Sequence, residues 1–416
     1  LKSSSFVENH SVAIALQIGA TVIEAKNYHA MVHNLLRESR FLLFLRNTSE
    51  LKYSLKHGLT EENQVNVAVK RHHESLDVFL NDEQISSFVK HDFDIKITND
   101  DFLKAGLDFQ KRELENGKFE FYDNDGRKLE NIPEKLGMLN ETRITLAASC
   151  KKNAIQSLKK EETLLFNYLP TSDQRFGFPY LVNADFVSKT DREFIQIENK
   201  WNHFLFYHIG RLSALWIAEL AKKTHVFEGR AHHTYIRTYL NLLPTALLDE
   251  NNAELGTINS AYNRGFLLGL EEESFVISKI GQMHKVNEVF LDDTGLSRVF
   301  GNNFISHISG NPKALPHFLI DTTSLRKEYL DIDRYSGGQL CLDLEKEENQ
   351  YTFHKYILGV KDSRYQDFLN WFSEFIHKEK IAPEWVFNLA CLRIDDHVVS
   401  FKEAISKETF ILRSAR

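Results

Sequence analysis

Hydrophobic and polar residues alternate in short runs through the first part of the chain. The alternation has a period of two, or shortens to a compact hydrophobic run, at residues 65–69, 93–97, 118–122 and 144–148. A period of two places successive side chains on opposite faces of a strand. The run Asp123-Asn-Asp-Gly126 supplies the residues of a tight hairpin turn. Residues 48–150 are therefore predicted to form strands and turns, with two further strands in residues 163–187.

Helical spacing becomes dominant beyond residue 190. Six hydrophobic residues recur every three or four positions: Trp201, Leu205, Ile209, Leu212, Trp216 and Leu220. This spacing predicts a long amphipathic helix that begins near Arg192 or Trp201 and carries these residues on one face.

The two ends of the chain have mixed patterns. Near the start, strands are predicted at residues 11–19 and 21–24, followed by a helical stretch and a dense hydrophobic segment at residues 41–45. Near the end, residues 339–344 and 351–358 predict a hairpin, and residues 365–377 predict an aromatic helix. The patterns indicate an α/β or α+β class. We predict the α+β form, in which a mixed sheet is followed by a mixed, largely helical C-terminal region.

Composition and charge narrow the class of protein. Hydrophobic residues make up 42% and charged residues 26%, which is enough apolar material for a packed core. The net charge is −7, and the 51 basic and 58 acidic residues are mixed along the chain. This mixing argues against a nucleic-acid-binding tail and against a polybasic membrane anchor. The sequence also has no hydrophobic run of the roughly 18 residues that a membrane span needs, and no signal-peptide pattern.

The cysteines and the first residue suggest where the protein works and what it is part of. Cys150, Cys341 and Cys391 lie far apart and lack the spacing of a zinc site. We therefore expect reduced thiols and a cytoplasmic location. The chain opens at Leu1 rather than at a methionine, so we expect its natural start to lie upstream.

Several short motifs can be compared with known phosphate-binding, protease and metal sites, and none of them has the residues that such a site needs. The sequence contains neither a Walker-type phosphate loop nor a Gly-x-Gly-x-x-Gly run after a strand. The triplet Asp293-Thr-Gly295 resembles an aspartic-protease loop, but such a site needs two of them and only one is present. A turn after a short strand is predicted there instead. The adjacent histidine pairs 72–73 and 232–233 would point in different directions on a helix or a strand, so neither pair suits a metal.

The segment Arg192-Glu-Phe-Ile-Gln196 carries the candidate chemistry. Arg192 and Gln196 are four residues apart, so at the N-terminus of a helix both side chains would project from one face. The positive end of the helix favours phosphate, and the guanidinium offers a planar, permanently charged fork for its oxygens. On these residues alone, a solvated arginine or a surface ion pair remains the alternative.

Residues 166–202 resemble a known family of ATPases. The runs Asn167-Tyr-Leu-Pro-Thr171, Gly177–Phe186, Thr190-Asp-Arg192 and Trp201-Asn202 are similar, in the same order, to runs in sacsin-type ATPases. That family belongs to the superfamily of gyrase, heat-shock chaperones, histidine kinases and MutL (GHKL), which share the Bergerat ATP-binding fold. Two flanking segments extend the resemblance: residues 41–47 and 287–296.

The resemblance implies a division of the chain into three parts. Residues 1–47 would be the end of an ATP-binding domain, residues 48–225 a transducer-like middle domain, and residues 226–416 a C-terminal region. In the related chaperones, an Arg-Glu-x-x-Gln segment of the middle domain contacts the γ-phosphate of ATP. The resemblance thus implies that Arg192 contacts the nucleotide and that Gln196 is an accessory catalytic contact.

The family's general base, Mg²⁺ ligand and adenine-binding loop cannot be recognised in this sequence. ATP and Mg²⁺ are therefore expected only in the full-length protein, and this fragment is expected to bind neither alone and to be inactive. The implied partner is the upstream ATP-binding domain, while a client protein, an effector or a second copy of the chain stay open. The alternative function is a non-enzymatic interaction module. Its aromatic residues, including Trp371, Phe372 and Phe375 on one predicted helix, are expected mostly in the core, with a docking surface as the other option.

Overall fold

The computed structural model describes most of the chain between residues 27 and 406. The described residues are 27–28, 30–32, 36, 39–45, 47–57, 60–72, 75–130, 132, 139–152, 154–223, 226–227, 230–231, 238–278 and 280–406. The strands predicted at residues 11–19 and 21–24 lie outside them, as do His73, His232 and His233.

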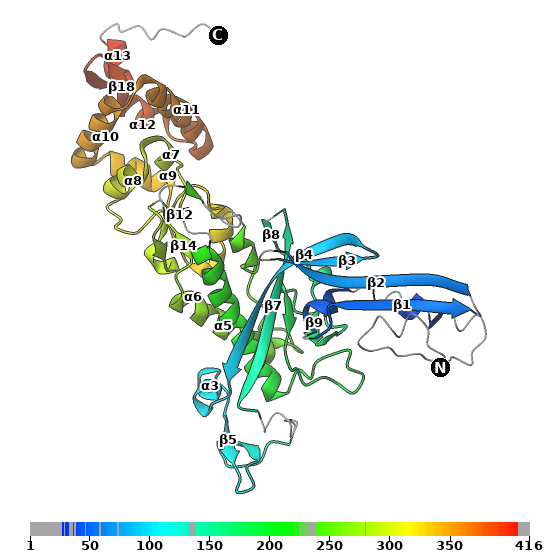
Figure 1. Ribbon diagram of the computed structural model, residues 1–416. Helices are drawn as coiled ribbons and strands as arrows, with labels where there is room; N and C mark the ends of the chain where they lie inside the picture. Colours follow the sequence, from blue (N-terminus) through cyan, green and yellow to red (C-terminus); the bar gives the residue numbers. More distant parts are fainter. Residues whose placement is uncertain are drawn as a thin grey trace.

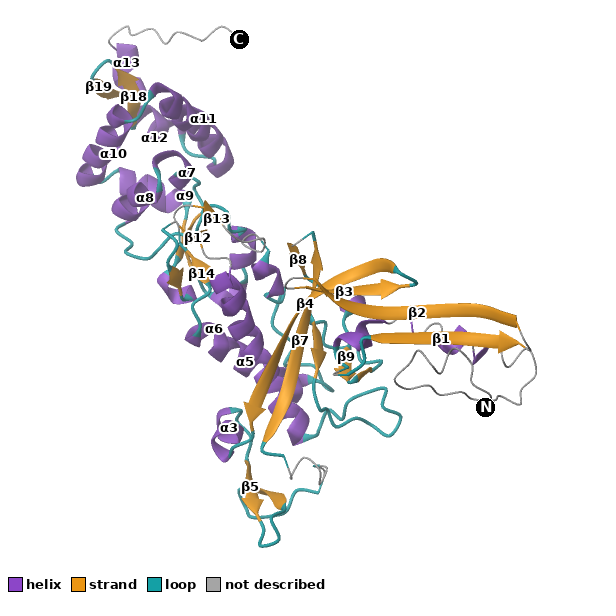
Figure 2. Cartoon of the chain, in the orientation of Figure 1, coloured by secondary structure: helices purple, strands orange, loops and turns teal. Residues whose placement is uncertain are grey.

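A mixed sheet dominates the first half of the molecule, as the residue pattern predicted. Its strands follow the order β1-β2-β3-β4-β7-β11-β9-β10, with β8 paired to β7. Their bounds are β1 (Glu50–His57), β2 (Thr60–His72), β3 (Ser75–Leu80), β4 (Glu83–Lys96), β7 (Glu141–Lys151), β8 (Ala154–Gln156), β9 (Leu165–Asn167), β10 (Leu169–Pro170) and β11 (Leu181–Asn183). Neighbours are antiparallel except β11 and β9, which run parallel. Together with the helical second half, this sheet confirms the α+β class (Figure 2).

Strand β4 joins two differently oriented halves of the sheet. Its first residues pair with β3, and its residues from Ser87 to Lys96 pair with β7. A long strand twists along its length, so partners at its two ends cannot be coplanar. The β1–β3 strands therefore point away from β7 (Figure 1). On the outer face, Arg143 donates to Asp94 across β4 and β7 at 2.6 and 3.1 Å.

A small subassembly follows β4. It consists of α3 (Asn99–Lys104), β5 (Phe109–Glu113) and β6 (Phe119–Asp123), and the β5–β6 hairpin lies at the end of the molecule opposite the C-terminal helices (Figure 1). The turn predicted at residues 123–126 is confirmed. Gly126 has φ +79°, which favours glycine, and its N–H donates to the Asp123 carbonyl at 3.0 Å.

Helices α5 (Lys200–Lys223) and α6 (Gly256–Glu272) form the centre of the molecule. The predicted helix is present and starts at the later of the two expected positions. It is buried on most of its circumference rather than on one face, because both the sheet and α6 cover it. The two helices approach closely at Gly210 and Gly265. A Cβ at either position would lie 2.2 Å from the Tyr262 carbonyl oxygen or 1.9 Å from that of Tyr207, so only glycine fits.

The connecting elements are short. They are η1 (Ser39–Leu43), η2 (Lys160–Glu162), β12 (Val226–Phe227), β13 (Arg230–Ala231), η3 (Tyr239–Leu242), β14 (Val276–Ile277), β15 (Met283–His284), η4 (Val286–Glu288), β16 (Phe290–Asp292), η5 (Thr322–Leu325), η6 (Glu328–Leu330) and β17 (Asp333–Tyr335). The C-terminal region adds α7 (Ser297–Phe300), α8 (Asn302–Ser309), α9 (Gly337–Leu344), α10 (Glu347–Gly359), α11 (Asp362–Glu379), α12 (Pro383–Asn388), β18 (Ala390–Ile394), β19 (His397–Ser400) and α13 (Phe401–Ser406).

The hairpin predicted at residues 339–344 and 351–358 is wrong, because both segments are helical. The side chain of Ser336 caps α9 by accepting from Gln339 N at 3.2 Å, and Glu347 and Glu348 lie in the first turn of α10. An N-terminal cap and acidic residues in a first turn both stabilise helices. The buried residues Leu340 and Leu344 of α9, and Asn349, Phe353 and Ile357 of α10, are also four positions apart, which the strand interpretation overlooked.

The aromatic helix predicted at residues 365–377 is confirmed as α11, but its aromatic side chains do not form a surface. Phe372 and Phe375 are buried, and the half-buried Trp371 donates its indole N–H to the Thr294 carbonyl at 2.7 Å. These residues therefore belong to the core of the C-terminal region, as mainly expected, and do not form the alternative docking surface.

Buried residues form three hydrophobic clusters. One lies under β2 and β3 and includes the segment 41–44, whose Phe44 ring is centred 4.5 Å from that of Phe166. A second is centred on α5 and α6 and includes residues on both sides of residue 225. The third fills the C-terminal helices from about residue 290 onward. Within the described residues, no helix combines the length and the apolar character needed to cross a membrane.

Candidate functional site

Arg192 lies on the loop of residues 184–199 between β11 and α5, which we call the Arg192 loop. The prediction that Arg192 begins a helix is wrong, since α5 starts at Lys200. A narrow turn forms instead. Lys189 N donates to the Phe194 carbonyl at 2.8 Å, and Arg192 N donates to the Lys189 carbonyl at 2.9 Å. Arg192 has φ +61°, a left-handed conformation that is uncommon for a residue with a side chain.

Gln196 does not stand beside Arg192 on a common face. Its backbone N–H donates to the Val187 carbonyl at 2.9 Å, and its side-chain amide donates to the Ser188 carbonyl at 3.0 Å. Both bonds close the base of the loop. Gln196 therefore has a structural part in holding the turn, whereas Arg192 lies at the turn itself.

The residues Trp201 and Asn202 anchor the loop to α5. The fully buried Asn202 side chain accepts from Val187 N at 2.9 Å and donates to the carbonyls of Val187 and Gln196, each at 2.8 Å. The Trp201 indole donates to the Asp185 carbonyl at 3.0 Å. Buried backbone groups need such partners, so one asparagine satisfies three groups on the two sides of the loop.

Two further asparagines of the family-like runs bond to backbone groups, one of them within the loop. Asn183 accepts from Tyr168 N at 2.8 Å, and Asn167 donates to the Phe186 carbonyl at 2.9 Å. Asn167, Trp201 and Asn202, which belong to the runs that resemble the family, thus bond directly to the Arg192 loop.

A buried charge pair beside the loop was missed by sequence reasoning. The Asp173 side chain is completely buried, and Arg175 donates to its two oxygens through Nε at 2.8 Å and Nη2 at 2.7 Å. These hydrogen bonds raise the pKa of the Arg175 guanidinium above its ordinary value. The third arm, Nη1, donates to Glu254 at 2.5 Å. The only signal in the sequence was an acid and an arginine two residues apart, a spacing too common to single out.

The Arg192 side chain is exposed, and it has no hydrogen bond or ion pair with any described residue. Lys189, also exposed, lies at the other end of the same turn, while Asp191 and Glu193 flank Arg192 with opposite charge. The turn is thus nearly neutral overall. Recognition of an anion here would depend on direct bonds from the guanidinium fork and not on a long-range field.

The other candidate motif is fully explained by local structure. Asp292 ends β16, and its carboxylate accepts from Thr294 N, Gly295 N and Ser297 N at 2.9, 3.2 and 2.8 Å. This confirms the predicted turn after a short strand. The neighbouring Asp293 carboxylate meets Arg326 at 2.5 Å and Arg334 at 2.8 Å.

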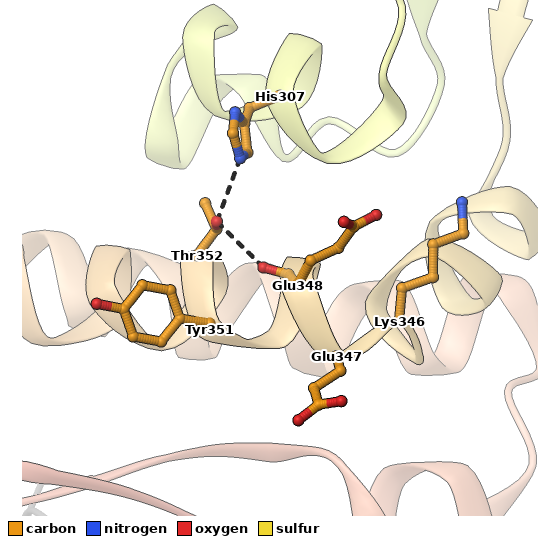
Figure 3. A pocket seen from close by; sticks show the side chains of 6 residues that line it. All are labelled: His307, Lys346, Glu347, Glu348, Tyr351 and Thr352. Carbon is orange, nitrogen blue, oxygen red and sulfur yellow. Dashed lines mark hydrogen bonds between the residues drawn. The ribbon is translucent and has the colours of Figure 1, made fainter.

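A wide hollow in the C-terminal region is lined by polar side chains that do not point toward a common position. Its volume is about 770 Å³, and it is lined by His307, Lys346, Glu347, Glu348, Tyr351 and Thr352. His307 and Thr352 are 3.2 Å apart, but Glu347 and Tyr351 point away from them (Figure 3). In the described part of the chain, no group of three or more His, Cys, Asp or Glu side chains could hold a metal ion.

Comparisons of the chain with models of protein families, with curated proteins and with solved structures found no match.

Proposed function

We propose that this chain is the transducer and C-terminal part of an ATP-driven, sacsin-like ATPase, and that Arg192 is its contact with the terminal phosphate. One observation supports the proposal above others. The guanidinium of Arg192 is exposed and unpaired among the described residues, on a turn that the Asn202 and Gln196 side chains hold by hydrogen bonds. An arginine held in this way is available to a partner that docks against the loop.

The residues present suit a phosphate. Arginine presents several N–H donors in a planar fork, and it keeps its charge at every physiological pH. ATP, when bound with Mg²⁺ in the upstream domain, would supply the phosphoryl group that is hydrolysed. Arg192 would donate to that group's oxygens and stabilise the charge that develops on them. The metal ligands and the general base would come from the ATP-binding domain.

This arrangement would make hydrolysis depend on docking. Arg192 can reach the phosphate only when the loop and the ATP-binding domain are in contact, so the contact would report the nucleotide state to the rest of the chain. Conformational change in a client, an effector or a second copy of the chain would be the output.

The test is to join the chain to its upstream ATP-binding domain and to measure ATP hydrolysis. Arg192→Ala should lower turnover roughly 100- to 1,000-fold, the usual loss when one preorganised donor is removed. The turnover of Arg192→Lys should lie between those of Arg192→Ala and the unsubstituted protein, because lysine keeps the charge but not the planar fork of donors. Arg364→Ala removes another exposed arginine, on α11, and should leave turnover unchanged. Unchanged turnover in Arg192→Ala would remove this residue from the proposal.

A further inference from the structure

The segment of residues 172–175 contacts the two residues that follow Arg192 in the loop, Glu193 and Phe194. Ser172 N donates to the Glu193 carbonyl at 2.8 Å. The Arg175 guanidinium lies over the Phe194 ring, 5.4 Å from its centre, which is a cation–π contact. Two successive residues of the loop are thus fixed by one neighbouring segment.

The same guanidinium reaches the start of α6. Arg175 holds the buried Asp173 carboxylate with two of its donors and the Glu254 carboxylate with a third, at 2.5 Å. Glu254 lies two residues before the first residue of α6, Gly256. Arg175 therefore contacts the loop, its own segment and the entrance of a central helix at the same time.

Helices α5 and α6 can transmit a displacement of either one. Their backbones are in direct contact at Gly210 and Gly265, where no Cβ could be accommodated. Asn202 ties the other end of the Arg192 loop to α5. The loop is consequently attached to α5 through Asn202 and to the segment that leads into α6 through Arg175 and Glu254.

We propose that Arg175 is a positioning residue that couples the phosphate contact of Arg192 to helix α6 through Glu254. The inference rests on the proposed function. When a phosphate draws Arg192 into contact, Glu193 and Phe194 move with it, and the Arg175 guanidinium over the Phe194 ring moves relative to Glu254. The pair with Glu254 is the part of this network that can change, because the bidentate pair with Asp173 is buried and the Glu254 side chain is 65% exposed.

The experiment compares Glu254→Gln with Glu271→Gln. Both remove one exposed carboxylate, from the entrance and from the last turns of α6 respectively, and Glu271 has no partner among the described residues. Hydrogen–deuterium exchange on the chain itself measures the loop without any nucleotide. We expect Glu254→Gln to raise the exchange rates of the Lys189 and Gln196 amides roughly 2- to 30-fold, the range usual for residues that couple two sites. Glu271→Gln should leave them unchanged.

ATP hydrolysis by the chain joined to its ATP-binding domain supplies the second measurement. Glu254→Gln should lower kcat with little change in KM, and this effect should vanish when Arg192 is already alanine. An equal loss in the Arg192→Ala background would show a general structural effect and overturn the coupling, as would a Glu254→Gln variant that matches Glu271→Gln in both measurements. If Arg192→Ala alone leaves hydrolysis unchanged, the proposed function fails. The link between Glu254 and the loop is then decided by the exchange rates alone.

Discussion

Two loops of this molecule look alike in sequence and differ in how their charges are satisfied. The Arg192 loop and the turn at residues 292–297 both follow a short buried strand, contain adjacent charged residues and lead into a helix. In the second, both carboxylates have partners within the protein, since Asp292 accepts from backbone groups and Asp293 pairs with two arginines. In the first, the Asn202 and Gln196 amides bond to the backbone and the Arg175 guanidinium packs on Phe194, while Arg192 is left unpaired within the described residues.

The difference separates a structural motif from a candidate site. A charged residue whose partners are all supplied by the fold has nothing left to offer a ligand. A charged residue held in an unusual backbone conformation, with its donors free, is available for recognition. Four predictions test this contrast, from the largest expected effect to the smallest.

The largest effect is expected at the anchor of the Arg192 loop. Asn202→Ala removes three buried hydrogen bonds. It leaves the Val187 N–H without a partner among the described residues, while the Val187 and Gln196 carbonyls still accept from Gln196 N and Asn199 N. Breaking this network should cost roughly 3 to 5 kcal/mol in the free energy of unfolding. Urea denaturation measures this loss. Asn251→Ala, at an exposed position, serves as the control and should cost less than about 0.5 kcal/mol. A loss below 1 kcal/mol for Asn202→Ala would mean that the loop is not held by its buried side chains.

The next prediction concerns acid sensitivity of the helix that anchors the loop. Burial of His208 on α5 lowers its pKa from 6.5 to about 4. The folded state thus resists protonation, and the unfolded chain binds more protons between these two values. Stability contributed by neutral His208 is complete above pH 6.5 and declines as the pH falls toward 4, by at most about 3 kcal/mol.

The measurement is the free energy of unfolding at several pH values between 7 and 4. His208→Gln should flatten its decline with falling pH, whereas substitution of the exposed His377 on α11 by glutamine should not. Parallel curves for His208→Gln and the unsubstituted protein would contradict the prediction.

A smaller effect is expected in the second loop. Asp292→Ala removes the acceptors of three backbone N–H groups ahead of α7, and we expect a loss of about 1 to 2 kcal/mol, typical of a lost helix cap. Asp292→Asn keeps one side-chain oxygen and should lose less. Thermal and urea unfolding of the two variants measure the difference. Equal losses in both would indicate that charge, and not hydrogen bonding, holds this turn.

The smallest effect is expected at Arg192 itself. Arg192→Ala should change the unfolding free energy by less than about 0.5 kcal/mol, because the side chain has no partner in the described structure. Arg192→Gly should stabilise by up to about 1 kcal/mol, since glycine adopts φ +61° without steric cost. Marked destabilisation of either variant would show that Arg192 has a structural role like that of Asp293.

The strands were the most predictable part of the fold. Residues 93–97 and 118–122 alternate clearly, and both are strands, because a half-buried strand imposes its period directly on the sequence. The hairpin predicted at residues 339–358 was wrong because a short amphipathic segment fits the period of a strand as well as that of a helix. The cap at Ser336 favours the helix. The segment starting at Arg192 was misassigned for a similar reason, since four-residue spacing does not distinguish a helix from a turn closed by distant residues.

The sequence by itself determined the α+β class, the long helix with its hydrophobic spacing and the glycine turn at residue 126, and it indicated Arg192 as the candidate phosphate contact. Only the tertiary structure decided what Arg192 and its neighbours do. Asn202, Asp173 and Glu254 reach the network around the loop from other segments, and Glu254 is 79 residues away from the Arg175 it contacts. Local patterns report the period of an element, but whether a charge is paired depends on which distant side chain the fold brings within bonding distance.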